Sequence, residues 1–157
     1  MRMFNRDGSE GLMCGNGIRC VAKYLFDNGI VKKPVINIET KSGIKSCSIM
    51  TMNGKAYKIT VDMGAAALRP EQVPVKLEGD MVVNKPVIID GHEYYITCAS
   101  MGNPHCVVYV SDTAGLNLPV LGGAMEHSKW FPEGVNTEFI QILDETHSVS
   151  YTHLRAH

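Results

Sequence analysis

The sequence predicts an α+β fold with short strands, hairpin turns and few helices. One segment, residues 18–26, has the apolar spacing that is typical of a helix with a single buried face. Strand-length apolar runs follow it, separated by turns rich in glycine, asparagine and serine. With 157 residues, of which 45% are hydrophobic, the chain is long enough to bury a sizeable core. These observations together favour sheets accompanied by a few helices.

The first predicted element is a helix that begins just after Cys14. Apolar residues recur there at the i, i+3, i+4 and i+7 positions that line one helix face. The dipeptide Asn28-Gly29 follows, and such residues commonly end helices. We therefore expect about three helical turns, whose buried stripe comprises Ile18, Val21, Ala22, Leu25 and Phe26.

Three strands are expected after this helix, at residues 35–39, 44–50 and 57–63. The last two are separated by Asn53-Gly54, a dipeptide that strongly favours a tight hairpin. A proline-containing linker is then expected over residues 65–74.

A second strand-rich region is expected beyond the linker. Gly91 and His92 are the predicted tip of another hairpin, and residues 116–127 have room for a short helix. The strands of this region are expected at residues 81–89, 94–99, 106–110 and 137–143.

The chain is accordingly divided into three parts. Residues 1–64 and 65–147 are two structural regions. Residues 148–157 show no clean period, so we interpret them as a non-native tail and exclude them from the expected fold.

Composition excludes several classes of function. The net charge is −1, which gives no basis for binding nucleic acid or an anionic membrane. No apolar run approaches the roughly 20 residues that cross a bilayer. The five cysteines form no CxxC pair, so we expect no metal site and a reduced, cytoplasmic setting. Cys47, Cys98 and Cys106 are interpreted as small buried apolar residues.

Cys14 is the first candidate for chemistry, because it stands at the N-terminus of the predicted helix. The positive end of the helix dipole stabilises a thiolate there. Gly15 and Gly17 let consecutive N–H groups point inward, so the same turn can hold a carboxylate. Asn16 adds a side-chain amide that both donates and accepts. The alternative is a tight turn with an inert, buried thiol.

A second candidate lies in the segment Gly102-Asn103-Pro104-His105. Pro104 fixes its own φ and pushes Asn103 towards an extended or turn conformation. Asn103 could bind an amine or carboxylate, and His105 could favour the thiolate form of a neighbouring cysteine. The alternative is a connecting turn with a surface histidine.

A third candidate is Asn136, at the start of the last predicted strand. It follows the turn Phe131-Pro132-Glu133-Gly134-Val135, which alone indicates nothing unusual. The remaining histidines lack acidic partners at metal-ligand spacing, and we interpret them as surface residues: His127, His147, His153 and His157.

Four segments in this order resemble the diaminopimelate epimerase family: FNxDGSE, MCGNGxRC, GNPH and FPxxVNxxF. Related racemases carry a Cys-Gly-His loop, whereas this chain has Cys-Gly-Asn-Gly. The resemblance implies two pseudo-symmetric halves, each a curved mixed β-sheet around a central helix. It also implies an isomerase without cofactor, in which one thiolate removes the α-proton of an amino acid and a second thiol protonates the opposite face.

The resemblance also assigns roles to individual residues. Cys14 corresponds to one of two catalytic cysteines, and His105 to the histidine that modulates the thiol pair. Cys20 corresponds to a core residue. The implied contacts to the substrate, diaminopimelate, are Asn5, Gly15, Asn16, Asn103 and Asn136.

The chain departs from the family at both ends. The N-terminal strand and loop of the family precede the FN segment, and its second Cys-Gly-Thr-Gly loop follows the point where residues 148–157 stand here. We therefore expect both halves to be incomplete, and the chain to be a poorly stable, inactive fragment of a homodimeric enzyme. Two alternatives remain: another racemase or isomerase of the same superfamily, and a noncatalytic carboxylate-binding domain.

Overall fold

The computed structural model describes residues 1–4, 8 and 10–153, which form two compact units. The first covers Met1–Ala65, and the described part of the second covers 66–153. Both contain helices and sheets, so the α+β prediction is confirmed. Asn5 lies outside the described residues.

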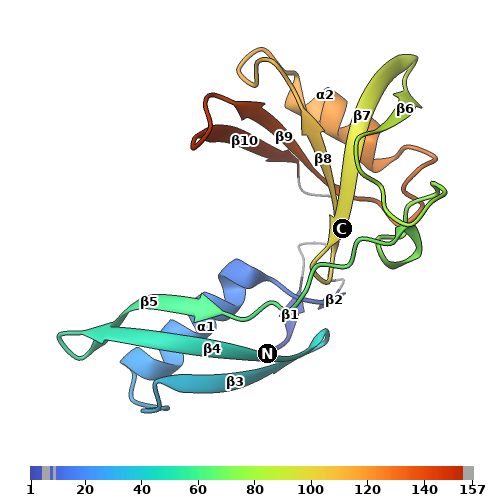
Figure 1. The fold of residues 1–157 in the computed structure, drawn as a ribbon. Coiled ribbons are helices and arrows are strands. Elements are labelled where there is room, and N and C mark those ends of the chain that lie inside the picture. Colours follow the sequence, from blue (N-terminus) through green and yellow to red (C-terminus); the bar gives the residue numbers. More distant parts are fainter. Residues whose placement is uncertain (5–7, 9, 154–157) are drawn as a thin grey trace. The chain divides into compact units, whose positions relative to one another are not determined.

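The first unit places one helix on a three-stranded antiparallel sheet of order β3-β4-β5 (Figure 1). A separate two-stranded ribbon joins β1 to β2. In chain order the elements are β1 (Met3–Phe4), β2 (Glu10–Gly11), α1 (Gly15–Asp27), β3 (Val35–Thr40), β4 (Gly43–Met52) and β5 (Lys55–Val61).

Helix α1 forms where the sequence predicts it. Ile18 and Ala22 are fully buried and face the sheet. The helix ends at Asp27, and Gly29 follows with a φ of +69°, a conformation that glycine adopts without strain. The carboxylate of Asp27 accepts the backbone N–H of Ala56 at 2.7 Å, which ties the end of α1 to β5.

The predicted hairpin between β4 and β5 is also present. Asn53 and Gly54 have φ values of +51° and +74°, as a type I′ turn requires. Strand β3 alternates exposed and buried residues, so one face of the sheet forms the core with α1.

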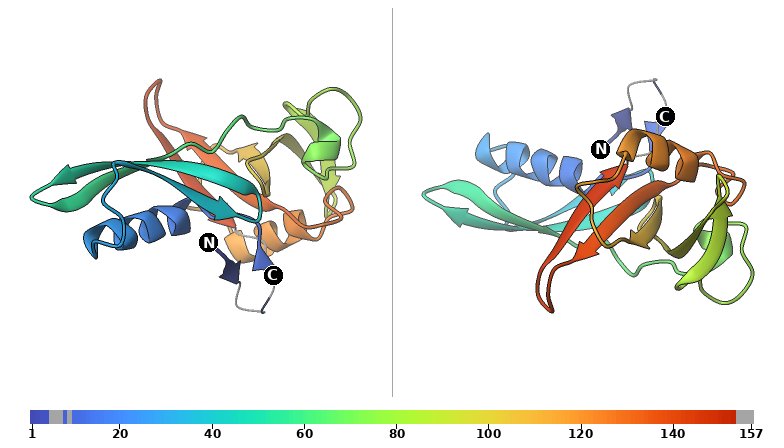
Figure 2. Two further views of the ribbon diagram at one scale, coloured as in Figure 1. Left: turned by 90° about the horizontal axis from the view of Figure 1, so that it is seen from below. Right: turned by 90° about the horizontal axis from the view of Figure 1, so that it is seen from above.

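The second unit is a five-stranded mixed sheet of order β10-β9-β8-β7-β6. Strands β8 and β9 are parallel and the other neighbours are antiparallel. Helix α2 connects β8 to β9 and packs against β9 and β10 (Figure 2). The elements are η1 (Pro70–Gln72), β6 (Lys85–Ile89), β7 (His92–Ser100), β8 (Pro104–Tyr109), α2 (Leu118–Glu126), β9 (Asn136–Ile142) and β10 (Ser148–His153).

Strand β6 is shorter than the strand predicted over residues 81–89. Asn84 has a φ of +50°, which interrupts an extended chain just before Lys85. Val82 is nevertheless fully buried, and its carbonyl accepts the N–H of Cys98 at 2.9 Å. The apolar run therefore marked core residues correctly but not the start of the strand.

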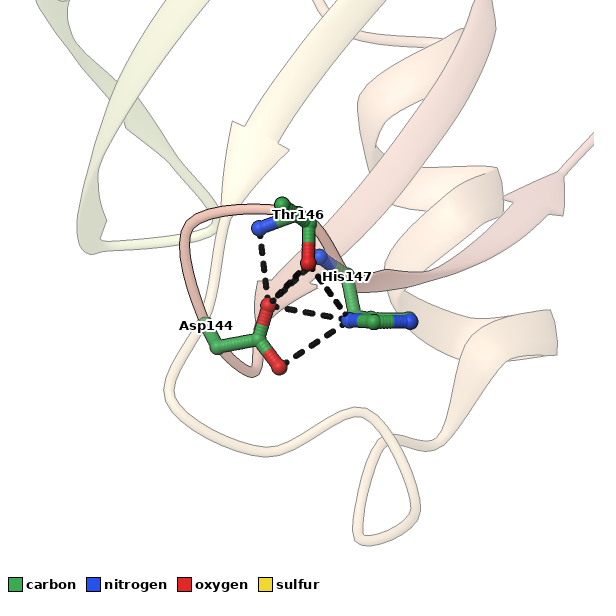
Figure 3. Close-up of polar contacts among 3 residues, drawn as sticks. All are labelled: Asp144, Thr146 and His147. Atoms are coloured by element: carbon green, nitrogen blue, oxygen red, sulfur yellow. Dashed lines mark hydrogen bonds and ion pairs between the residues drawn. The ribbon is translucent and has the colours of Figure 1, made fainter.

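The exclusion of residues 148–157 from the fold was wrong for Ser148–His153. These residues form β10, which pairs with β9 from Ser148↔Ile142 to His153↔Thr137. The connecting turn is closed by Asp144, whose carboxylate accepts hydrogen bonds from Thr146 and His147 (Figure 3). The sequence signal was an alternation of Val149, Tyr151 and His153 with small hydroxyl residues, which is typical of a strand.

His153 is not the surface residue that the sequence suggested. Its side chain is 22% exposed, and its Nε2 lies 2.9 Å from the buried carboxylate of Glu126 on α2. The ring lies close against Gly122, where an added Cβ would come within 2.2 Å of it. His153 therefore joins β10 to the helix, because the alternation of the strand turns it towards α2.

Candidate functional site

Cys14 is the N-cap residue of α1. Its backbone is extended, with φ −140° and ψ 110°, and its half-buried Sγ accepts the N–H of Gly17 at 3.3 Å. The first turn of the helix contains no acidic residue, so no carboxylate there opposes a negative charge on the sulfur. The half-buried sulfur thus lies at the N-terminus of α1, with the backbone N–H of Gly17 directed at it.

Gly15 and Asn16 line a groove of about 410 Å³ between the start of α1 and β5. The groove is also lined by Arg19 and Lys58 and by no carboxylate. The guanidinium of Arg19 donates to the side-chain oxygen of Asn16. Two cations and a helix N-terminus at one groove favour an anionic group such as a carboxylate.

Cys20 is exposed, so its assignment to the core was wrong. It follows buried Ile18 by two residues, which is about 200° around the helix, and so lies on the opposite side. Cys14 is thus a half-buried thiol at the start of α1, whereas Cys20 is an exposed thiol within the helix.

Asn103, His105 and Asn136 lie together at one edge of the second sheet. Asn103 is in the turn between β7 and β8, His105 is the second residue of β8, and Asn136 is the first residue of β9. Because β8 and β9 are parallel, their N-terminal ends meet at the same edge, and His105 is the register partner of Asn136. Asn136 is 5% exposed, whereas Asn103 is half-buried.

Glu138 belongs to this cluster and was missed by the sequence analysis. Its Oε1 lies 2.6 Å from Nδ1 of His105. The signal was present, because residues i and i+2 of a strand share a face and Glu138 follows Asn136 by two. What the sequence alone did not reveal was the parallel pairing that brings β9 beside His105.

The other three cysteines are buried, as predicted. Burial raises the pKa of the Cys47 thiol. Cys98 and Cys106 are register partners on β7 and β8. The hydrogen bond that the Cys106 thiol makes with Cys98 and, second, its burial hold the pKa of Cys106 well above its usual range. None of these three stands at a helix N-terminus.

The described residues contain no group of three or more histidine, cysteine, aspartate or glutamate side chains that could hold a metal ion. Within the same residues, every helix is too short or too polar to cross a membrane.

Solved structures of amino-acid racemases and epimerases share this fold. A probable proline racemase from Agrobacterium radiobacter matches 96% of this chain and 48% of its own, with a TM-score of 0.71 and 16% identity. A hydroxyproline epimerase from Agrobacterium vitis matches with a TM-score of 0.70, also at 16% identity, over 96% of this chain and 47% of its own. The chain thus shares the fold of these two structures, an epimerase-like fold of the kind that the resemblance implied.

Sequence comparisons identify the family. A sequence model described as diaminopimelate epimerase matches residues 1–69. A diaminopimelate epimerase from Acetivibrio thermocellus is 49% identical over 146 residues, which are 93% of this chain and 52% of that protein. Another, from Agathobacter rectalis, is 45% identical over 91% of this chain and 53% of its own length. The chain belongs to the diaminopimelate epimerase family, and it spans about half the length of the curated relatives it matches.

Proposed function

We propose that this chain supplies one catalytic thiol and most of the substrate contacts of an enzyme that epimerises LL-diaminopimelate to meso-diaminopimelate without a cofactor. The observation that carries the proposal is the position of Cys14 as the N-cap of α1, with its sulfur accepting the N–H of Gly17. The 49% sequence identity to the diaminopimelate epimerase of Acetivibrio thermocellus supports the choice of substrate.

In this proposal Cys14 exchanges a proton with the α-carbon of the substrate. Removing an α-proton leaves negative charge that spreads towards the adjacent carboxylate. Gly15 and Asn16 hold that carboxylate at the N-terminus of α1, beside the cationic groove, where N–H groups and positive charge stabilise the developing anion. Asn5, which is outside the described residues, contributes a further contact.

We also propose roles for three residues of the second unit. Asn103 and Asn136 bind polar groups of the substrate, and His105 modulates the protonation of the thiols. Their common position at one sheet edge supports a shared role.

A second thiol, on the opposite face of the α-carbon, is required by this mechanism. Cys47, Cys98 and Cys106 are buried, and Cys20 lies within α1 rather than at its N-terminus. We therefore propose that the 157-residue chain alone does not epimerise its substrate, and that the whole protein is a cytoplasmic homodimer carrying the second thiol.

A chimeric enzyme tests this function. In the Acetivibrio thermocellus relative, the matching 146 residues are replaced by those of this chain. The chimera is incubated with LL-diaminopimelate in heavy water, and deuterium at the α-carbon and formation of the meso isomer are measured. We expect both, and we expect Cys14→Ser to lower the rate by about 10²–10⁴-fold, whereas Cys20→Ser leaves it unchanged.

The same assay separates the alternatives. Turnover of another amino acid in place of diaminopimelate would indicate a different racemase of the superfamily. Binding of diaminopimelate without deuterium exchange would indicate a noncatalytic carboxylate-binding domain. Epimerisation by the purified 157-residue chain would contradict the requirement for a second thiol.

A further inference from the structure

The pair His105–Glu138 contains one of the shortest side-chain contacts among the described residues of the second unit. Nδ1 of His105 and Oε1 of Glu138 are 2.6 Å apart, and the two side chains are 28% and 17% exposed. A carboxylate has no proton to donate, so the proton between the two atoms belongs to Nδ1. Such charge-assisted hydrogen bonds are short and stronger than neutral ones.

The surroundings of the second carboxylate oxygen of Glu138 affect how strongly this side chain holds His105. Oε2 is buried and has no hydrogen-bond partner within the part of the chain that the structure describes. Half-buried charge without full solvation is costly unless it is paired. His105 is therefore held firmly, because a movement away from Glu138 would leave the half-buried carboxylate without its partner.

The backbone makes the contact possible. His105 and Glu138 lie on the parallel strands β8 and β9, where Val107 is the register partner of Glu138. His105 and Val107 point to one face of the sheet, as Asn136 and Glu138 do, so the carboxylate reaches the imidazole across one strand spacing.

We infer that Glu138 is a positioning residue for His105: it holds the proton on Nδ1 and leaves Nε2 as the ring atom that exchanges protons with a ligand. The role of a carboxylate behind a histidine is to fix its tautomer and orientation. When Nε2 takes a proton from a bound ligand, the products are the deprotonated ligand and an imidazolium, and Glu138 compensates the new positive charge. The catalytic consequence of this positioning rests on the proposed function, whereas the assignment of the Nδ1–H tautomer does not.

Nitrogen-15 NMR of the 157-residue chain tests the assignment directly. At about pH 9, where imidazoles are ordinarily neutral, His105 is expected as the Nδ1–H tautomer. Glu138→Met keeps a side chain of similar length but removes the acceptor, so the ratio of Nδ1–H to Nε2–H is expected to fall at least about tenfold. Glu145→Met, at an exposed position on the turn before β10, is the matched control and leaves the ratio unchanged.

Two results would overturn the inference: Nε2–H as the main tautomer in the unsubstituted chain, or an unchanged ratio in Glu138→Met. Protection of Cys98 and Cys106 from alkylation shows that each variant keeps its folded core.

The chimeric enzyme then separates positioning from a merely structural role. With Glu138→Met we expect kcat to fall while KM for diaminopimelate is retained. An altered tautomer with unchanged kcat would refute the catalytic part of the inference. An inactive chimera with Glu138 intact would instead count against the proposed function, and the NMR result would still decide the tautomer.

Discussion

The backbone N–H of Gly17 donates to Sγ of Cys14 at 3.3 Å, and a Cβ atom added to Gly17 would lie 3.4 Å from that sulfur. The absence of a side chain at residue 17 therefore keeps one side of the thiol open. An alanine there would favour the helix, and its methyl group would cover the sulfur by van der Waals contact.

Gly17→Ala is accordingly expected to separate stability from reactivity. Alanine favours a helix over glycine by up to about 1 kcal/mol, so the free energy of unfolding should rise or stay the same. The rate of alkylation of Cys14 by iodoacetamide, measured against exposed Cys20 in the same molecule, should fall. Gly15→Ala is the control, because its added Cβ would contact only the end of Met63, at 3.9 Å. An equal fall in both variants would refute the steric argument.

Thiol labelling should also distinguish the cysteines of the two cores. Burial raises the pKa of the Cys47 thiol. The hydrogen bond between Cys106 and Cys98, together with burial, raises the pKa of Cys106. Both thiols therefore resist deprotonation to the thiolate. We expect each to react more than about tenfold more slowly than Cys20, and equally fast after unfolding in denaturant. Mass spectrometry of labelled peptides provides the measurement. Uniform reactivity without denaturant would show that the isolated chain does not maintain these cores.

The turn between β9 and β10 should lose stability in acid. Hydrogen bonds from the backbone N–H of Thr146, then from the side chains of His147 and Thr146, lower the pKa of Asp144. A carboxyl group whose pKa is lowered on folding stabilises the fold above its unfolded pKa, and this contribution disappears as pH falls through the folded value. The protection factor of the Leu143 amide in hydrogen exchange should therefore fall below about pH 4, because this amide donates to the carbonyl of His147. In Asp144→Asn this fall should be absent, and its persistence would assign the effect elsewhere.

The packing of β10 on α2 is tested by two neighbouring glycines. Gly122→Ala places a methyl group against His153 and should destabilise the second unit by about 1–3 kcal/mol. Gly123→Ala has no neighbour within 4 Å of its added Cβ and should not destabilise it. Urea unfolding measures both.

A double-mutant cycle completes that test. In a His153→Ala background the cost of Gly122→Ala should largely vanish, because the ring that it strikes is gone. An unchanged cost would show that β10 does not pack on α2 as described.

Local patterns in the sequence were sufficient for much of the fold. The stripe that includes Ile18 and Ala22 predicted α1, and Asn53-Gly54 predicted a hairpin, because both depend on residues close in sequence. Ser148–His153 was missed since its alternation is carried by small hydroxyl residues rather than by a continuous apolar face. The segment becomes a strand through pairing with β9 and the His153–Glu126 contact.

The candidate site was predictable to a lesser extent. Cys14 lies at the helix N-terminus where the glycine-rich turn predicted it, because a cap is a local feature. Glu138 was missed because its contact with His105 depends on the parallel pairing of β8 with β9, and no local pattern specifies which strands become neighbours.

That parallel pairing also has a kinetic consequence. The β6–β7, β7–β8 and β9–β10 pairs are hairpins between consecutive strands, whereas β8 and β9 meet only after the intervening α2 has been placed. Contacts between distant parts of a chain tend to form late, and changes to late contacts accelerate unfolding more than they slow folding. Substitutions at Glu138 should therefore shorten the lifetime of the native sheet while leaving the folding rate nearly constant.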